Sequence, residues 1–313
     1  MSFYFASFSE GLGDLLIGLP ALKSLICTGA PTYLIIRSPK QEQVAELVPG
    51  LAGAIREPEF LSRKLSPGDV FINLRDHPLP RDNMFGADCF FEQFGRISIV
   101  ESLKRICEDL IVRDLGIPVD YRYEPFPYKR NEQAYGKVIL VPGSAGRYKC
   151  WPAENWLDVR SRLKERGLDS VVVGQPERSS EVAEVLSLGF PHLETPTFAT
   201  AIDVISSAHS VISVDTGLMH LAVQQQIPTV ALHQFRSIFA RVEESCCRPI
   251  FAVDCIPECL TWMDVHPGSV LFEKFEWREF LPCHGQENCR KIAEISVDTV
   301  LENFDDLVKV PAL

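Results

Sequence analysis

The segment with the clearest chemistry is Asp215-Thr216-Gly217 followed by His220, placed where an apolar run gives way to a helical pattern. Glycine lets a ligand approach the backbone, and the N–H groups at the start of the following helix attract an anion such as a diphosphate. Thr216 adds a hydroxyl, and His220 would face the same site. Asp215 would repel a phosphate, so it is expected to cap the helix or to bind a sugar hydroxyl. For His220 the alternative is an ordinary core histidine.

A second group follows another apolar run, in the segment PGSAGRYKCWP. The small residues Gly143 and Ser144 leave backbone N–H donors accessible. The cations Arg147 and Lys149 come a few residues later. Free N–H groups beside two positive charges are typical of an anion clamp. The alternative is a surface loop with solvated cations.

Near the N-terminus an apolar run leads to Gly11, Gly13 and Asp14, and then to a leucine-rich helical pattern. The glycine spacing differs from G-x-G-x-x-G, and a carboxylate stands where a phosphate would need free N–H donors, so a dinucleotide site fits poorly. We expect instead that the glycines let a second molecule approach and that Asp14 accepts a proton from it. The alternative makes Asp14 the N-cap of the helix.

Glu177 follows a further apolar run that ends in a glycine. A carboxylate at such a strand end can accept hydrogen bonds from the hydroxyls of ribose or another sugar. Helix capping or plain solvation explains the residue equally well.

These groups need elements to position them, and short β-rich runs alternate with helical patterns along the chain. Several runs are apolar on both faces, as expected of parallel strands covered by helices on both sides, so the pattern indicates an α/β fold. An acidic amphipathic helix over residues 295–310 is expected to pack on the surface. The expected strands cover residues 3–8, 32–36, 70–74, 138–141, 170–173, 211–214 and 229–232.

A polar, proline-rich stretch near residues 118–135 separates the third run from the fourth. We expect the linker there, between a domain of residues 1–130 and a domain of residues 131–313. Each would be a Rossmann-like, doubly wound sheet that binds ligands beyond the carboxyl ends of its strands. Two such edges facing each other would form a cleft, and every group above falls on such an edge.

Composition excludes several classes of protein. The 313 residues exceed what one hydrophobic core usually serves, which favours two domains. The net charge of −11 argues against binding to nucleic acid or to an anionic lipid surface. The N-terminus lacks the basic region of a signal peptide, and no apolar stretch approaches the ~18 residues of a membrane span. A cytoplasmic protein is therefore predicted.

Three motifs together resemble glycosyltransferase family 9, the heptosyltransferases. They are G-L-G-D-x-x-x-x-x-P, P-G-S-x-x-x-x-K-x-W-P and D-T-G-L-M-H-L-A. The resemblance implies the GT-B fold and a nucleotide-sugar donor, typically ADP-heptose, held mainly by the C-terminal domain. It also implies inverting transfer to an acceptor hydroxyl, with no cofactor required for catalysis.

By motif position, the resemblance makes Asp14 the general base. Lys149 and the Ser144 loop would hold the diphosphate, while Glu177 and Asp215 would bind sugar or ribose hydroxyls. The phosphate subsite would be completed by Thr216, Gly217 and His220.

The acceptor side departs from the family pattern. Gly11 and Gly13 belong to the loop on that side, but residues 74–96, which should contact the acceptor, do not match the enzymes of the lipopolysaccharide core. The acceptor is therefore left unassigned.

Four cysteines near the C-terminus have the spacing C-x3-C-x23-C-x5-C: Cys255, Cys259, Cys283 and Cys289. Four thiolates can form a tetrahedral zinc or iron site that would staple the tail. Some relatives of the family, the autotransporter heptosyltransferases, carry an iron on C-terminal cysteines. Cysteines without metal are the alternative.

Two other functions stay open. A nucleotide-sugar epimerase or hydrolase of the GT-B type would act on the donor without any acceptor. A non-enzymatic binding protein would be organised around a metal held by the cysteines.

Overall fold

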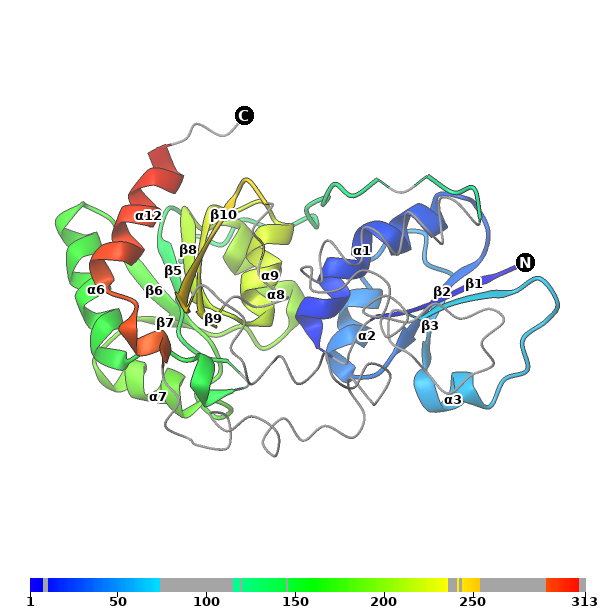
Figure 1. Ribbon diagram of the computed structural model, residues 1–313, viewed down its shortest axis with the longest axis horizontal. Coiled ribbons are helices and arrows are strands. Elements are labelled where there is room, and N and C mark those ends of the chain that lie inside the picture. The colour runs from blue at the N-terminus through cyan, green and yellow to red at the C-terminus, as the bar shows by residue number, and fades with distance from the viewer. Residues whose placement is uncertain are drawn as a thin grey trace. The chain divides into compact units, whose positions relative to one another are not determined.

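The computed structural model in Figure 1 describes residues 1–7, 11–73, 115–118, 120–144, 146–235, 241, 244–253 and 291–309. The described chain forms two compact units, and the change from one to the other falls between Glu124 and Pro125. Each unit is built on a parallel sheet of its own, so the predicted α/β class is confirmed.

Unit 1, the N-terminal unit, has four parallel strands in the order β3-β2-β1-β4. The carboxyl end of β1 therefore lies in the middle of one sheet edge. The elements of unit 1 are β1 (Phe3–Ala6), α1 (Leu12–Ile26), β2 (Thr32–Ile36), α2 (Pro39–Ala45), β3 (Gly53–Arg56), α3 (Glu57–Leu61) and β4 (Val70–Asn73).

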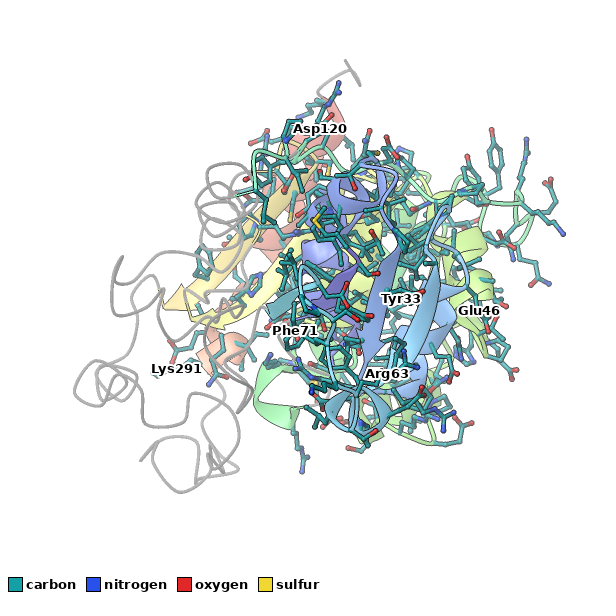
Figure 2. The ribbon with its side chains drawn as sticks, turned by 90° about the vertical axis from the view of Figure 1, so that its right-hand side faces the viewer. Tyr33, Glu46, Arg63, Phe71, Asp120 and Lys291 are labelled. Atoms are coloured by element: carbon teal, nitrogen blue, oxygen red, sulfur yellow. The ribbon has the colours of Figure 1, made fainter. Side chains whose placement is uncertain are left out.

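Aromatic and leucine side chains build the core of unit 1. Strand β1 is buried along its whole length, and α1 buries a run of leucines at helical spacing. Tyr4 stacks on Tyr33 with ring centroids 5.3 Å apart, and Phe60 packs on Phe71 at 4.6 Å. Tyr33 and Phe71 are labelled in Figure 2. This packing fixes the strands whose ends carry the polar groups discussed below.

Unit 2 has six parallel strands in the order β10-β9-β8-β5-β6-β7. The elements are β5 (Val138–Val141), η3 (Arg147–Lys149), α6 (Ala153–Glu165), β6 (Ser170–Val173), α7 (Ser180–Ser187), β7 (His192–Leu193), α8 (Phe198–Ser206), β8 (Ser210–Val214), α9 (Gly217–Gln224), β9 (Thr229–Phe235), β10 (Cys247–Val253), η5 (Lys291–Glu294) and α12 (Val297–Lys309).

Helices cover both faces of the unit 2 sheet. Figure 1 shows α6 and α12 on one side and α8 and α9 on the other. Alternate residues of β9 follow this division, because Val230 and Leu232 join the core under α6 and α12 whereas Ala231 packs against α9. Unit 2 is therefore doubly wound, as the apolar strand runs predicted.

Three strands were not predicted: β3, β7 and β10. All three lie at or next to a sheet edge, where fewer residues need to be apolar. β3 buries only Ile55, neither residue of β7 is fully buried, and β10 contains Pro249, which an edge strand tolerates. Each strand therefore carries too weak an apolar signal to be read from the sequence.

The last helix is more than a surface element. Expected over residues 295–310, it forms α12 and buries the side chains of Val300, Leu301 and Phe304 in the core of unit 2. Just before it, the Ile295 carbonyl accepts a hydrogen bond of 3.0 Å from the buried indole Nε1 of Trp151. Helix α12 thus closes one face of the unit 2 core.

Truncation of Phe304 tests this role. We expect Phe304→Ala to lower the free energy of unfolding of unit 2 by about 3–5 kcal/mol, because it opens a cavity at a side chain only 1% exposed. Denaturant unfolding followed by tryptophan fluorescence measures the change. The exposed Glu302 on the same helix provides the comparison, and Glu302→Ala should leave stability nearly unchanged. Equal effects of the two substitutions would contradict the assigned packing.

Within the described part of the chain, none of the helices combines the length and apolarity needed to cross a bilayer.

Candidate functional site

Two of the sequence motifs meet at one edge of the unit 2 sheet. β5 and β8 are parallel neighbours with Val141 opposite Ser213, so the loops that follow them leave the sheet side by side. The Ser144 hydroxyl, in the first of these loops, donates a hydrogen bond of 2.7 Å to the backbone carbonyl of Asp215 in the second. The fold thus joins residues that lie 71 positions apart in the chain.

Lys149 and Asp215 form the central ion pair of this group. Lys149 Nζ lies 2.8 Å from Asp215 Oδ2, and the side chains are 28% and 9% exposed. Burial alone would raise the pKa of Asp215. The positive charge of Lys149 and its hydrogen bond, helped by His233 and His220, outweigh burial and hold the pKa well below the usual range. Asp215 is therefore a carboxylate at neutral pH.

His220 lies beside this pair on α9. Its Nε2 is 3.9 Å from Asp215 Oδ1, and the residue is 4% exposed. Burial, reinforced by the charge of Arg241, lowers the pKa of His220 to about 3 despite the opposing charge of Asp215. The ring is thus neutral at physiological pH, and its Nδ1 makes no hydrogen bond to another described residue.

A second histidine, His233, belongs to the same group and was missed in the sequence. It lies on β9, is 2% exposed, and neither ring nitrogen bonds to another described residue. Burial lowers the pKa of His233. The charge of Lys149 lowers this pKa further, whereas the charge of Asp215 acts to raise it. In the sequence, His233 is visible only as a histidine that interrupts the apolar run of β9. That feature does not mark a functional residue unless the neighbouring strands that bring it to Asp215 are known.

The start of α9 lies at the same sheet edge. Thr216 is the N-cap, with an extended backbone, and its side chain makes no capping hydrogen bond. Asp215 does not cap the helix, because its carboxylate binds Lys149 instead. The Thr216 hydroxyl is therefore not used for capping, and the start of α9, at Gly217, presents backbone N–H groups of the kind that bind an anion.

Gly143 also has a packing role that the sequence did not indicate. A Cβ at this position would lie 2.5 Å from Val182 Cγ2 and 2.8 Å from Ser179 Oγ, at the start of α7. The glycine therefore lets α7 close over the end of β5.

We expect Gly143→Ala to cost about 1–3 kcal/mol of stability by overpacking this contact. Gly53→Ala is the matched substitution, because a Cβ there has its nearest neighbour at 3.6 Å. Thermal unfolding of the two variants should therefore differ, and a Gly143→Ala protein as stable as the parent would contradict the close approach.

Arg147 and Glu177, the other charged residues predicted for this site, are more exposed than Lys149 and Asp215. Arg147 is 59% exposed, and its Nε lies 3.3 Å from Oε1 of Glu181 in the first turn of α7. Glu177 is exposed in the turn before that helix and does not cap it, since the Ser179 side chain accepts from Val182 N. Glu181 is thus a further member of this region that the sequence did not indicate.

Asp14 lies at the corresponding sheet edge of unit 1. Helix α1 begins at Leu12 with Gly11 as its N-cap, so Asp14 is a first-turn residue and not the cap. Gly13 is buried within the same turn, and Asp14 is half-buried. A carboxylate in the first turn is stabilised by the helix dipole, which favours its ionised form.

Two predicted regions lie outside the described residues. They are the four cysteines, Cys255, Cys259, Cys283 and Cys289, and the acceptor-side segment 74–96. The metal site and the acceptor contacts therefore stay predictions. In the ranges that the structure describes, no three histidine, cysteine or acidic side chains gather to hold a metal ion.

Comparison with known proteins agrees with this geometry. Residues 116–237 match the family model of glycosyltransferase family 9 (heptosyltransferase). A curated relative, lipopolysaccharide heptosyltransferase 1 of Pseudomonas aeruginosa, is 24% identical over 144 residues. That alignment covers 44% of this chain and 41% of the relative, so the chain matches less than half the length of this relative.

Solved structures resemble the chain over nearly its whole length. A glycosyltransferase family 9 protein from Veillonella parvula has a TM-score of 0.68 at 16% identity, covering 98% of this chain and 97% of its own. ADP-heptose LPS heptosyltransferase II of E. coli has a TM-score of 0.65 at 15% identity, covering 99% of each chain. Iron-containing TibC of enterotoxigenic E. coli has a TM-score of 0.65 at 16% identity, covering 98% of this chain and 76% of its own.

These structures confirm the predicted GT-B fold with its two Rossmann-like domains. The family match covers the segment that contains Ser144, Lys149 and Asp215, where the structure brings the motif residues together. The resemblance seen in the sequence is therefore confirmed by the match of residues 116–237 to the family model of glycosyltransferase family 9 (heptosyltransferase) and by the similarity to the curated relative.

Proposed function

We propose that the protein is an inverting glycosyltransferase that moves a heptose, or a similar sugar, from a nucleotide-diphosphate donor to an acceptor hydroxyl. ADP-heptose is the donor we favour, because it appears in the name of a structurally similar E. coli enzyme. The observation that carries the proposal is the meeting of Ser144, Lys149 and the start of α9 at one sheet edge, inside the family 9 domain.

The donor diphosphate would bind at this edge. Lys149 carries an ammonium group with three N–H donors, so it can donate to a phosphate oxygen as well as to Asp215. Pairing also neutralises Asp215, which would otherwise repel the diphosphate. The Thr216 hydroxyl and the N-terminal turn at Gly217 would supply uncharged donors.

His220 and the two acidic residues would complete the donor site. The neutral imidazole of His220 adds a polar group without adding charge to a group that already contains Lys149. The Asp215 carboxylate and the exposed Glu177 are acceptors suited to ribose or sugar hydroxyls. Arg147, already paired with Glu181, would contribute positive charge at the rim.

Rate acceleration follows from the charge that develops on the leaving group. When the bond to the anomeric carbon breaks, the diphosphate gains negative charge, and donors already in place at its oxygens stabilise the transition state more than the ground state. Such an arrangement needs no metal ion, since Lys149 and the helix N-terminus supply the positive potential.

Asp14 would act as the general base on the acceptor hydroxyl. An aspartate, with an ordinary pKa of about 3.9, is too weak a base to ionise an alcohol beforehand. Proton transfer would therefore occur late, once bond breaking has made the anomeric carbon electrophilic. The position of Asp14 at the carboxyl edge of the unit 1 sheet supports this role.

A cytoplasmic location is part of the proposal. The described cysteines, Cys27, Cys150, Cys246 and Cys247, are free thiols, as expected in a reducing compartment. Burial raises the pKa of Cys247 to about 12, so this thiol stays protonated and unreactive. The four C-terminal cysteines are proposed as a structural zinc or iron site, which metal analysis of the purified protein would test.

A donor screen tests the function. We expect ADP-heptose to raise the melting temperature more than GDP-, UDP- or dTDP-sugars do, and Lys149→Met to remove that shift. Nucleotide release that requires an added acceptor would identify a transferase. Conversion of the donor sugar without an acceptor would instead identify an epimerase or hydrolase, and the absence of any nucleotide response would favour the binding protein.

A further inference from the structure

A second polar group occupies the carboxyl edge of the unit 1 sheet, where Asp14 also lies. In the strand register, Ala6 is opposite Ile35 and Ile36 is opposite Arg56. The residues that follow these strand ends, Ser7, Arg37 and Glu57, therefore emerge together at this edge. Gln41 on α2 reaches the same place.

Hydrogen bonds join these four residues into one network. Gln41 Nε2 donates to Ser7 Oγ at 2.8 Å, and Gln41 Oε1 accepts from the Arg37 backbone N–H at 2.8 Å. Arg37 Nε donates to Glu57 Oε1 at 2.6 Å, and its Nη1 donates to the Ser7 carbonyl. Ser7 thus receives one bond at its backbone and one at its side chain.

The network is buried, unlike most ion pairs among the described residues. Ser7 and Gln41 are fully buried, the Arg37 side chain is 4% exposed, and Glu57 is 23% exposed. A guanidinium in such surroundings loses hydration and needs its partners to be closely placed. Its geometry is therefore fixed more firmly than that of a surface pair.

Ser7 is the point where β1 leaves the sheet toward Asp14. Three residues separate Ser7 from Gly11, the N-cap of the helix that carries Asp14 in its first turn. One of these bonds comes from Arg37, just after β2, and the other from Gln41 on α2, so Ser7 is held from outside its own segment.

We propose that Arg37 and Gln41 are positioning residues, which fix the Asp14 carboxylate by holding the end of β1 through Ser7. The inference rests on the proposed function, because it assigns Asp14 the task of accepting the acceptor proton. Neither residue contacts a substrate in this scheme. Their effect on the reaction would be exerted through Ser7, at the end of β1.

The test uses the full-length protein with ADP-heptose and the acceptor that supports transfer. Gln41→Met keeps the volume but removes both hydrogen bonds, and Arg37→Lys keeps the charge but loses the fork that joins Glu57 to Ser7. We expect kcat to fall about 10- to 100-fold in each, as misplaced catalytic groups do, with the donor KM unchanged. Gln41→Glu, which can accept from both Arg37 N–H and the Ser7 hydroxyl, should recover part of kcat.

Arg63→Lys is the matched variant, because Arg63 forms an exposed ion pair with Glu59 in the same unit and is labelled in Figure 2. It should leave kcat unchanged. If the network only supports the sheet, Gln41→Met and Arg37→Lys will lower the melting temperature while the folded protein keeps its full kcat, and the proposal is then wrong.

A double-mutant cycle separates this inference from the proposed function. If Asp14→Asn lowers kcat to a small measurable rate and Gln41→Met lowers that rate no further, both residues act through one group and the proposal holds. If Asp14→Asn is inactive but Gln41→Met keeps its full kcat, only the positioning role fails. If Asp14→Asn stays active, the assignment of the base fails, and the positioning role fails with it.

Discussion

We expect Asp14→Asn to lower the rate of sugar transfer by about 10²- to 10⁴-fold, the usual contribution of a general base. Asparagine keeps the shape of the side chain but cannot accept the acceptor proton. Because the residues proposed to bind the donor belong to unit 2, calorimetry should give an unchanged donor Kd for the same variant. The two measurements together separate loss of catalysis from loss of binding.

The structural alternative for Asp14 makes a different prediction. Its first-turn charge stabilises α1 through the helix dipole by about 0.3–1 kcal/mol, and Asn would remove that contribution without affecting chemistry. Glu154, an exposed first-turn carboxylate on α6, is the matched position, and Glu154→Gln should change neither rate nor affinity. Retained transfer in Asp14→Asn, or loss of donor binding, would contradict the assigned role.

The second large effect is expected from Lys149→Met. Removing Lys149 leaves the buried Asp215 carboxylate without its cation, and breaking one partner of a buried pair costs about 3–5 kcal/mol. Loss of a fixed positive group at the diphosphate should also lower kcat/KM by about 10²- to 10³-fold. Denaturant unfolding and steady-state kinetics with the donor measure the two losses.

The stability loss should depend on pH with a definite sign. In the parent protein the pKa of Asp215 lies below the ordinary value, so its contribution is present above about pH 4 and is lost as the pH falls through the lowered value. Without Lys149, burial becomes the dominant influence and raises that pKa. Stability of the variant should then rise as the pH falls from 7 toward about 5, and the gap to the parent should narrow.

Two further variants make this result specific. Asp215→Asn in the Lys149→Met background removes the unpaired charge and should recover much of the lost stability at neutral pH. Lys164→Met, at an exposed lysine of α6, should have no comparable effect. The stability difference between Lys149→Met and the parent could instead be the same at every pH. In that case Asp215 would not depend on Lys149 to stay ionised.

Much of the fold could be predicted because parallel strands buried on both faces leave a strong local signal. β2, β5 and β6 have the predicted bounds, since each is a short apolar run followed by an arginine, a proline or a glycine, respectively. β10 had no such signal, because an edge strand can carry arginine and proline. The last helix was predicted nearly to its ends, although its depth of burial was not.

The sequence by itself determined which chemical groups follow the strands, because a carboxylate, a cation and a glycine at a strand end are visible as residue types in order. It also determined the family resemblance, which rests on those motifs. Only the tertiary structure decided which groups meet. Three contacts show this: Lys149 pairs with Asp215, α7 approaches Gly143, and a network forms around Ser7. Each contact joins residues that follow different strands. The order of the strands in the sheet brings these residues together, and spacing along the chain does not encode that order.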